Sequence, residues 1–452
     1  MTSDRLRLAA IPGGFFVLAV LTGWLLAALL PLGQAADEGA HAIRADALSR
    51  GQLLAHREGS GGGFTTAATL LDLASVTPEK QVQTRAERDA AEAMRWGGAS
   101  RFIALGTIAT YFPAVYVPSA LAIAVARAAG GTPAQAFRAG RRINVLAFAL
   151  LGTAALAVAQ RGRALIAAVL LLPMSLGLAA SLSGDAMLIG CAALAAACAT
   201  RGRPGDWWFS LGLLTVLGLT KLPYAPLLLV PLIAGRPRVV VRLMSVVVAG
   251  GLMLGWAGFN QAQMIGTANR TSIEAGPLSP GPPRRFDLSA QIEVLRADPT
   301  RAVTLVAHAL AQDVWTRRQL IGVLGWLHIV LPNWVYATWT TVLAFAILAL
   351  LTEAGPTAGP AMAMQLGAAL LGMALSVWAI VLAQYLAWTP VGAAEIEGLQ
   401  GRYYLPLLPF LAVGVPALAP MRLRGLAAVP LVAGALGTVA VPVTVALASY
   451  LR

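Results

Sequence analysis

Residues 8–32, LAAIPGGFFVLAVLTGWLLAALLPL, form a run of 25 residues without a charge, and Arg5 and Arg7 precede it. An α-helix needs about 20 predominantly apolar residues to cross the hydrocarbon core of a bilayer, so this run is long enough to span it. Because the run is also longer than the apolar core of a typical signal peptide, we expect an uncleaved anchor. Its basic flank predicts a cytoplasmic N-terminus and a chain that emerges on the other side at Gly33.

Composition extends this interpretation to the whole chain. Of the 452 residues, 58% are hydrophobic and 12% are charged, which is far outside the proportions of soluble globular proteins. Apolar runs of about 15 to 25 residues recur along the sequence, and short polar stretches separate them. We therefore expect an all-α polytopic membrane protein in which residues 1–452 form one integral membrane domain, a bundle of about 11 transmembrane helices (roughly 10 to 13).

The charge distribution indicates topology and gives no support to a nucleic-acid partner. Lys and Arg outnumber Asp and Glu by 33 to 20, and the formal net charge is +13. Most of the basic residues lie in short loops between apolar runs, as the positive-inside rule predicts. The two cysteines, Cys191 and Cys198, lie on one face of an alanine-rich helix at a spacing that prevents a bond between them.

The segment from Phe102 to Ala129 allows two topologies. If it crosses the membrane, the basic loop QRGR (160–163) lies outside, and if it only dips into the interface, that loop lies inside. The second topology also keeps three further basic loops inside: RGRPGD (201–206), GRPRVVVR (235–242) and PMRLRG (420–425). It leaves four arginines outside: Arg127, Arg138, Arg141 and Arg142. We favour it because Pro113 and Pro118 let the segment form interfacial helices.

In this topology three large loops lie outside: residues 33–101, 260–332 and 389–404. The first loop is mostly polar and is expected to contain interfacial helices. Its GSGGG stretch (59–63) predicts a flexible connection. Thr77 is expected to cap a charged surface helix that begins at Pro78.

An acidic motif, Asp37-Glu38-Gly39-Ala40-His41, opens the first outer loop at the start of an expected helix. Asp37, His41 and Arg44 share one face of that helix. The dipole and the free N–H groups of a helix N-terminus stabilise carboxylates as anions, which suits a base or a cation ligand. Ordinary capping of an interfacial helix is the alternative interpretation of the same spacing.

Two charged residues farther along the chain are expected at the same face of the membrane. Asp185 ends the short outer turn SLSGD (181–185), which places it on the side of Asp37. Lys221 interrupts apolar sequence, which costs about 2.5–3.5 kcal/mol near the bilayer centre unless the cation is paired or reaches the interface. Lys221 either extends to the interface or provides a counter-charge for a lipid phosphate at the outer leaflet.

A further polar motif, Glu397-Gly-Leu-Gln400-Gly-Arg402-Tyr403-Tyr404, ends the third outer loop. Arg402 could bind a phosphate through two donors, and the glycines on either side of Gln400 would let the backbone approach a ligand. An interfacial aromatic belt with an anchoring arginine is the alternative. The sequence has no HExxH, CxxC, Walker or GxSxG motif, so zinc, ATP and serine hydrolase chemistry are unsupported.

Six stretches, in order across residues 36–411, resemble the bacterial membrane family catalogued as domain of unknown function 2142. They are ADEGAHAIRADALSRGQLL, YFPAVYVPSALA, LLPMSLGLAASLSGDAMLIG, LTKLPYAPLLLVPL, GVLGWLHIVLP and YLAWTPVGAAEIEGLQGRYYLPLLPFL. That family resembles in turn the GT-C glycosyltransferases, multispanning enzymes that take sugars from polyprenyl-phosphate carriers. In those enzymes the first outer loop carries a catalytic acidic residue.

The resemblance implies a GT-C-like bundle in the bacterial cytoplasmic (inner) membrane, with its active site facing the periplasm or exterior. It implies an inverting sugar transfer from a polyprenyl-phosphate donor to a periplasmic or cell-surface glycan, lipid or protein. By position, Asp37 or Glu38 would be the base, and Asp185 would be a second acidic site. The donor phosphate would face three residues, namely Lys221, Arg402 and Tyr403. Sugar or acceptor contacts would come from His41, Arg44, Tyr111, Glu397 and Gln400.

The resemblance leaves a cofactor and two other classes of function open. Some GT-C enzymes use a divalent cation, and Mg or Mn would here be bound by Asp37 and Asp185. A transporter or flippase of lipid-linked saccharides is one alternative, although no internal repeat supports it. A non-catalytic protein of envelope assembly is the other, and it predicts that Asp37, Glu38 and Asp185 could be neutralised without consequence.

Overall fold

The computed structural model describes residues 3–59, 61–77, 81–234, 237–264, 287–312, 314–352, 359–415 and 428–450. Across these ranges the chain is mostly helical, as the composition predicts. Several stretches discussed above lie outside the described residues: the predicted first helical residue Pro78, residues 235–236 and the basic loop 420–425. Parts of the predicted second outer loop, residues 265–286 and 313, also lie outside them.

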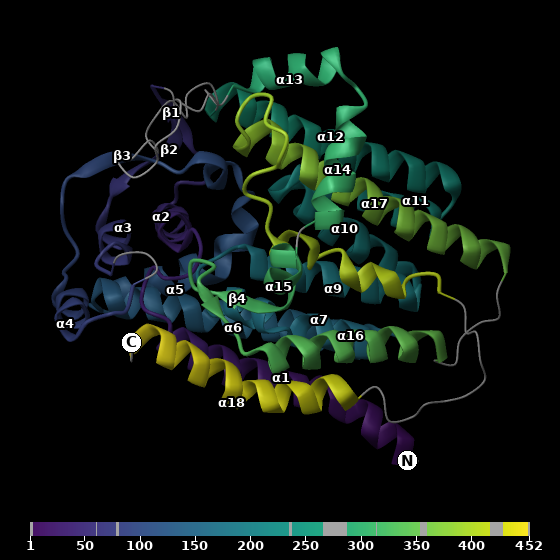
Figure 1. Cartoon of the computed structure of the whole chain (residues 1–452), viewed down its shortest axis with the longest axis horizontal. Coiled ribbons are helices and arrows are strands. Elements are labelled where there is room, and N and C mark those ends of the chain that lie inside the picture. Colours follow the sequence, from purple (N-terminus) through teal and green to yellow (C-terminus); the bar gives the residue numbers. More distant parts are fainter. Residues whose placement is uncertain are drawn as a thin grey trace.

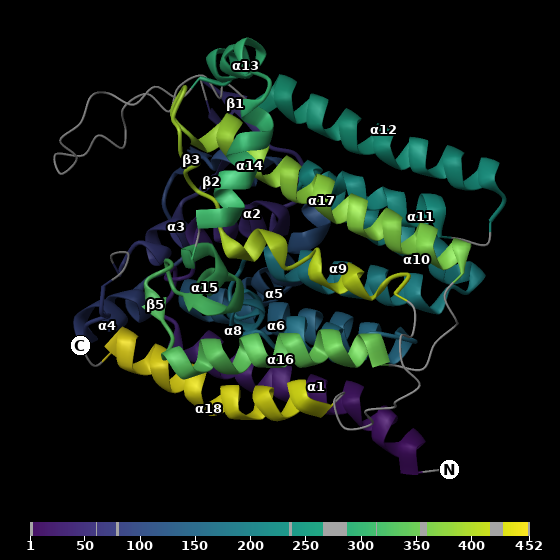
Figure 2. The same ribbon diagram turned by 45° about the vertical axis from the view of Figure 1, so that its right-hand side comes forward.

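Among the described residues, six helices are long and apolar enough to cross a membrane. They are α1 (Ser3–Leu29), α6 (Pro133–Val158), α12 (Val239–Met264), α16 (Asn333–Thr352), α17 (Pro360–Trp388) and α18 (Val429–Tyr450). They run along one common direction and form a bundle (Figures 1 and 2). Their outward faces carry exposed apolar side chains such as Val17, Val247 and Leu436, which suit contact with lipid. The chain is therefore a polytopic membrane protein, as predicted.

Shorter segments pack between and beside these helices. They are α7 (Arg163–Leu171), α8 (Pro173–Ala179), α9 (Asp185–Arg201), α10 (Pro204–Thr220), η3 (Leu222–Leu228), α11 (Leu229–Ile233), η4 (Gly401–Tyr404) and η5 (Leu408–Ala412). Every residue from Ala164 to Leu171 is buried, so α7 contacts protein on all sides. Helices α7, α8 and α9 are the most deeply buried of these segments.

The packing of α1 on α6 shows which loops share an end of the bundle. A Cβ on Gly152 would lie 2.5 Å from the Phe15 ring, and one on Gly23 would lie 2.6 Å from Val145. These pairs make the two helices antiparallel, and their glycines allow the backbones to approach closely. The loop 160–163 therefore lies at the end of the bundle where α1 begins. We call this the N-terminal end, and the opposite one the outer end.

The segment before α6 enters the bundle from the outer end and returns there. It consists of η2 (Pro113–Tyr116) and α5 (Val117–Ala128). Tyr116 lies beside Gly184, directly before α9. Arg127, near the other end of α5, pairs with Asp46 of α2 (Glu38–Ser49), the first helix after α1. Residues 102–129 therefore do not cross the bundle, which agrees with the topology inferred from loop charge.

The first outer loop contains a small sheet that the sequence analysis did not predict. Strands β1 (His56–Glu58), β2 (Gly61–Ala67) and β3 (Ser100–Ala104) are antiparallel in the order β1-β2-β3, with Phe64 opposite Ile103. The loop also contains α3 (Thr69–Ala74), α4 (Arg85–Ala93) and η1 (Gly106–Thr110). The prediction that residues 59–63 are flexible was wrong for Gly61, Gly62 and Gly63, which belong to β2. A Cβ on Gly63 would lie 1.9 Å from the Ile103 carbonyl oxygen, so glycine permits the pairing with β3.

The charged surface helix of this loop begins later than predicted. Thr84 accepts a hydrogen bond from the Glu87 N–H, and the Glu87 carboxylate accepts one from the Thr84 N–H, so this capping box starts α4 at Arg85. The predicted helix is wrong for residues 81–84, which are not helical, whereas its expected first residues, 78–80, lie outside the described residues.

The other outer segments meet the first loop at the same end of the bundle. They comprise α13 (Leu288–Ala297), α14 (Arg301–Gln312), α15 (Val314–Gly322), β4 (Val323–Leu324) and β5 (Ile329–Val330). The indole N–H of Trp326, in the turn between β4 and β5, donates to the Gly33 carbonyl at 2.9 Å. The Gly401 N–H donates to the Gln319 side chain at 3.0 Å, which joins η4 to α15. All three predicted outer loops thus contribute to one surface.

Candidate functional site

Glu38 is enclosed in a buried ion pair. Arg141 donates from Nε to Glu38 Oε1 at 2.8 Å and from Nη2 to Oε2 at 2.6 Å, and both side chains are 0% exposed. The Leu182 and Ala35 N–H groups also donate to this carboxylate. Arg141 uses its other donors on three carbonyls near the end of α1: Ala27, Leu30 and Pro31. Glu38 therefore joins α1, α2, α6 and the turn before α9, and its oxygens are occupied by protein donors.

Asp37 lies next to Glu38 in sequence but directs its side chain to a different place. It precedes α2 in the left-handed region, with φ 59° and ψ 11°, and its carboxylate makes no capping hydrogen bond to the helix. Aspartate is one of the few residues that adopts this conformation. The Asp37 side chain is 38% exposed and accepts a hydrogen bond from Arg402 Nη2 at 2.8 Å. The alternative interpretation of Asp37 as an ordinary helix cap therefore does not hold.

Asp37 belongs to a group of four charged side chains from distant parts of the chain. Lys221 Nζ donates to Asp185 Oδ1 at 2.6 Å, and Arg402 Nε lies 3.6 Å from Asp185 Oδ2. We call Asp37, Asp185, Lys221 and Arg402 the charge cluster. Its formal charges sum to zero. Its members come from the N-termini of α2 and α9, the end of α10, and η4, so the structure brings these four predicted site residues together at the outer end of the bundle.

Aromatic rings line the charge cluster. The Lys221 ammonium lies 5.2 Å from the centroid of the Tyr111 ring and 4.8 Å from that of Tyr403. The Tyr224 hydroxyl donates to the Tyr403 carbonyl at 2.8 Å, which fixes the backbone beside Arg402. Lys221 is thus paired with a carboxylate and held between two rings, and its side chain is 13% exposed. These interactions offset the cost of placing a cation in an apolar segment.

His41 lies behind the charge cluster, where it is 2% exposed. Its Nδ1 hydrogen-bonds with the Tyr116 hydroxyl at 2.6 Å, and its Nε2 lies 3.5 Å from Ser183 Oγ. Burial lowers the pKa of His41 to about 4, although Asp185 and Asp37 act in the opposite direction. The imidazole is therefore neutral at pH 7.

Arg44 is also buried and connects α2 to the segment after β3. It donates to the Leu53 carbonyl at 3.0 Å and to the Tyr111 carbonyl at 3.3 Å, and it lies over the Phe64 ring. Arg44 therefore holds Tyr111 in place beside Lys221.

Glu397 and Gln400 lie a few residues before Arg402 in the chain. Glu397 is exposed, and its N–H donates to Thr389 Oγ1 at 3.1 Å. Gln400 is half-buried, and its carbonyl accepts the Tyr403 N–H. Its side-chain oxygen is buried and accepts no hydrogen bond from the described residues.

The sequence analysis assigned no role to Arg141, Asn144 or Ser183. Asn144 donates to the Ser181 and Ser183 carbonyls at 2.8 and 3.2 Å, which shapes the turn before Asp185. The signal that could have identified Arg141 and Asn144 is a polar side chain within an apolar helix, since such residues in membrane proteins face a partner.

A divalent cation does not fit this arrangement. Within the described residues, no three His, Cys, Asp or Glu side chains are grouped so that they could hold a metal ion. The two carboxylates predicted as ligands, those of Asp37 and Asp185, both contact the Arg402 guanidinium, and Asp185 also pairs with Lys221. Arg402 and Lys221 therefore supply the positive charge that neutralises these two carboxylates.

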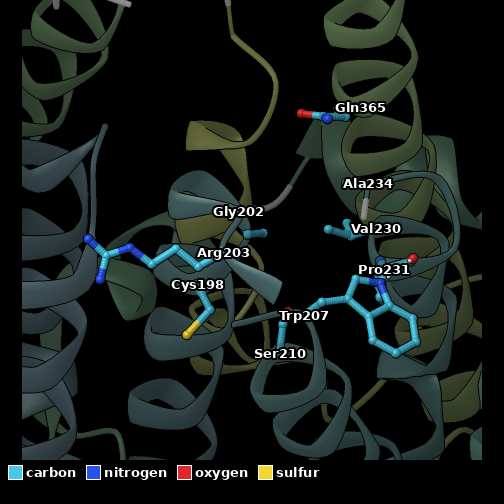
Figure 3. Close-up of a pocket in the computed structure, with 10 residues that line it drawn as sticks. Cys198, Gly202, Arg203, Trp207, Ser210, Val230, Pro231, Ala234 and Gln365 are labelled. Atoms are coloured by element: carbon cyan, nitrogen blue, oxygen red, sulfur yellow. Dashed lines mark hydrogen bonds between the residues drawn. The ribbon is translucent and has the colours of Figure 1, made fainter. Parts of the chain in front are cut away.

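A cavity of about 210 Å³ lies at the N-terminal end, where α9 ends, whereas the charge cluster contains Asp185 at the start of α9. Figure 3 shows the residues that line this cavity. It is lined by Cys198, Ala199, Gly202, Arg203, Trp207, Ser210, Val230, Pro231, Ala234 and Gln365. The Trp207 indole donates to the Pro231 carbonyl and Ser210 Oγ donates to Ala195, so these polar groups already have partners. The cavity shares no residue with the charge cluster.

Comparison with known proteins identifies a family but no characterised relative. The chain matches no curated protein and no solved structure. The model of a family described as "Predicted membrane protein (DUF2142)" matches residues 18–411, a range that includes every member of the charge cluster. Because this match covers most of the chain, the protein belongs to the domain of unknown function 2142 family of predicted membrane proteins.

Proposed function

We propose that this protein is a glycosyltransferase that moves a sugar from a polyprenyl-phosphate carrier to an acceptor hydroxyl at the outer face of the bacterial cytoplasmic membrane. The observation that carries the proposal is the charge cluster at the outer end of the bundle, where the partly exposed Asp37 carboxylate pairs with Arg402 and the buried Asp185 pairs with Lys221 and Arg402. The proposal also rests on the resemblance of the sequence motifs to GT-C enzymes.

In this proposal Asp37 is the general base. Its carboxylate accepts the proton of the acceptor hydroxyl while the hydroxyl oxygen attacks the anomeric carbon. The bond from that carbon to the lipid phosphate breaks, the phosphate leaves with the electron pair, and the configuration inverts. Asp37 is preferred over Glu38 because the Glu38 carboxylate is buried and its oxygens accept hydrogen bonds from Arg141 and two backbone N–H groups.

Arg402 and Lys221 would stabilise the negative charge that develops on the departing phosphate. Both cations are held in place by carboxylates and are largely buried, and donors fixed in advance in a water-poor site are the most effective. The rings of Tyr111 and Tyr403 would form the walls against which the sugar lies. The acceptor is a periplasmic or cell-surface glycan, lipid or protein.

We further propose about eleven membrane crossings with a cytoplasmic N-terminus. The six long helices would account for six of them. The other five would be α7 with α8, α9, α10, η3 with α11, and residues 401–415. The contact between the Trp207 indole, near the start of α10, and the Pro231 carbonyl, near the end of α11, supports a return of η3 and α11 to the N-terminal end. Crossings this short require local thinning of the bilayer or polar ends.

The proposal is tested by Asp37→Asn and Glu38→Gln in the native host, with surface glycans profiled by mass spectrometry and protein abundance measured by immunoblot. Asp37→Asn should abolish a surface glycan at normal abundance. Glu38→Gln should instead lower the abundance, because it removes a buried partner. Asp72→Asn is the matched control, since Asp72 is an exposed outer-loop carboxylate that also pairs with an arginine. Unchanged glycans in Asp37→Asn at normal abundance would contradict the proposal.

A further inference from the structure

We infer that Arg402 occupies the place that a divalent cation would take between Asp37 and Asp185, so that this site works without a metal. The role given to Arg402 during sugar transfer rests on the proposed function. Its exclusion of a metal rests only on the geometry and charges of the charge cluster.

The first argument is the position of the guanidinium. Arg402 Nη2 is 2.8 Å from Asp37 Oδ2, and Arg402 Nε is 3.6 Å from Asp185 Oδ2. One planar group therefore bridges the two carboxylates that would otherwise be the ligands. Arginine suits this role because its donors have a fixed planar geometry and it stays charged at every accessible pH.

The second argument is that the fold holds Arg402 in place. Its side chain is 4% exposed. The preceding Gly401 is pressed against α15, where a Cβ would lie 2.3 Å from both the Leu320 nitrogen and the Thr316 carbonyl oxygen. The Gly401 N–H also donates to Gln319. The backbone that carries Arg402 therefore cannot move away from the carboxylates without disturbing its contact with α15.

The third argument is charge. Asp37 and Asp185 are neutralised by Arg402 and Lys221, so a divalent ion would add two uncompensated positive charges to a largely buried site. Burying uncompensated charge is strongly unfavourable. In addition, Arg402 Nη1 is buried and donates to no described residue. That nitrogen remains as a donor for an anionic ligand such as a departing phosphate.

The inference is tested with Mn²⁺ as the probe, using the full-length protein in lipid nanodiscs after treatment with EDTA. Electron paramagnetic resonance should detect no Mn²⁺ bound by the wild-type protein. Arg402→Gln removes the bridging cation and should create a Mn²⁺ site, which the double variant Arg402→Gln/Asp185→Asn should lose. Arg101→Gln, which frees only the single carboxylate of Asp72, is the matched control and should gain no site.

Two results would overturn the inference. One is a wild-type protein that binds Mn²⁺ after EDTA treatment, and the other is a folded Arg402→Gln variant that gains no Mn²⁺ site. If Arg402→Gln does not fold, Mn²⁺ binding by the wild-type protein still tests the inference. The variant Arg402→Lys gives a second test, because it keeps one positive charge and should also bind no Mn²⁺. None of these readouts depends on sugar transfer, so failure of the proposed function can be distinguished from failure of this inference.

Discussion

At the scale of single residues, two adjacent carboxylates have opposite roles because the backbone turns between them. The left-handed conformation of Asp37 directs its carboxylate to the charge cluster, while Glu38 begins α2 and is enclosed by protein. The motif in the sequence identified both as candidates but could not separate them. The decisive partner of Glu38, Arg141, lies 103 residues away, and no local pattern indicates a contact at that separation.

Glu38→Gln should destabilise the protein by about 3–5 kcal/mol, because it leaves the Arg141 charge buried without its partner. The double variant Glu38→Gln/Arg141→Gln removes both charges and should recover part of that loss. The measurement is thermal unfolding in detergent. A single variant as stable as the wild type would show that the pair contributes little to the fold.

The stability of the protein should also depend on the protonation of His41. The pKa of His41 in the folded protein is about 4, below its ordinary value of 6.5, because burial disfavours the charged ring more than Asp185 and Asp37 favour it. The unfolded chain therefore binds the proton more readily. The stabilisation is complete above pH 6.5 and is lost as the pH falls toward 4, by up to about 3 kcal/mol. His41→Gln should reduce this fall in melting temperature, and an identical pH profile would contradict the assignment.

At the scale of elements, the outer loop shows where sequence patterns are insufficient. The glycines of β2 were interpreted as flexible, but in a strand the same residues allow another backbone to approach closely. The start of α4 was misplaced for a different reason. Thr77 followed by proline matches one sequence signal for a helix start. Helix α4 instead begins after Thr84, where Thr84 and Glu87 form the reciprocal hydrogen bonds of a capping box. The long helices were easier to predict, since an apolar run of sufficient length has few alternatives in a membrane.

Gly63→Ala should destabilise the sheet of the first outer loop by about 2 kcal/mol, because the new Cβ would collide with the Ile103 carbonyl. Gly97→Ala is the control, since a Cβ at Gly97 meets no atom within 4 Å. Limited proteolysis of the outer loop and thermal unfolding both report the effect. Equal behaviour of the two variants would show that β2 and β3 do not pair as described.

At the scale of the whole molecule, loop charge favoured the topology in which residues 102–129 do not cross, where the apolar sequence alone allowed two topologies. Helix α7 is buried on all sides from Ala164 to Leu171, so these residues are all apolar and their pattern does not distinguish a helix in the protein core from one that faces lipid. The charge cluster was predictable as a group because each member lies at the end of an apolar run on one side of the membrane. The pairing within the cluster was not, because it depends on how η4 packs against α15.

The topology can be checked by labelling single cysteines in a variant that lacks Cys191 and Cys198. A membrane-impermeant maleimide added outside intact cells should label Glu92→Cys, in the first outer loop, and should not label Gln160→Cys, at the N-terminal end. Both positions are exposed, so accessibility alone does not favour either. Labelling at position 160 from outside would reverse the proposed arrangement of the spans.

The buried pair of Glu38 and Arg141 also has a consequence for biogenesis. The two residues are 103 positions apart, and ribosomes add roughly 5–20 residues per second, so Glu38 is synthesised about 5 to 20 s before its partner. During that interval the carboxylate must stay hydrated, because an unpaired charge inserts poorly into hydrocarbon. The buried pair can therefore form only after Arg141, near the start of α6, has been synthesised. Closure of this pair is a late step of membrane assembly, and a nascent chain arrested before residue 141 should expose α2 to proteases.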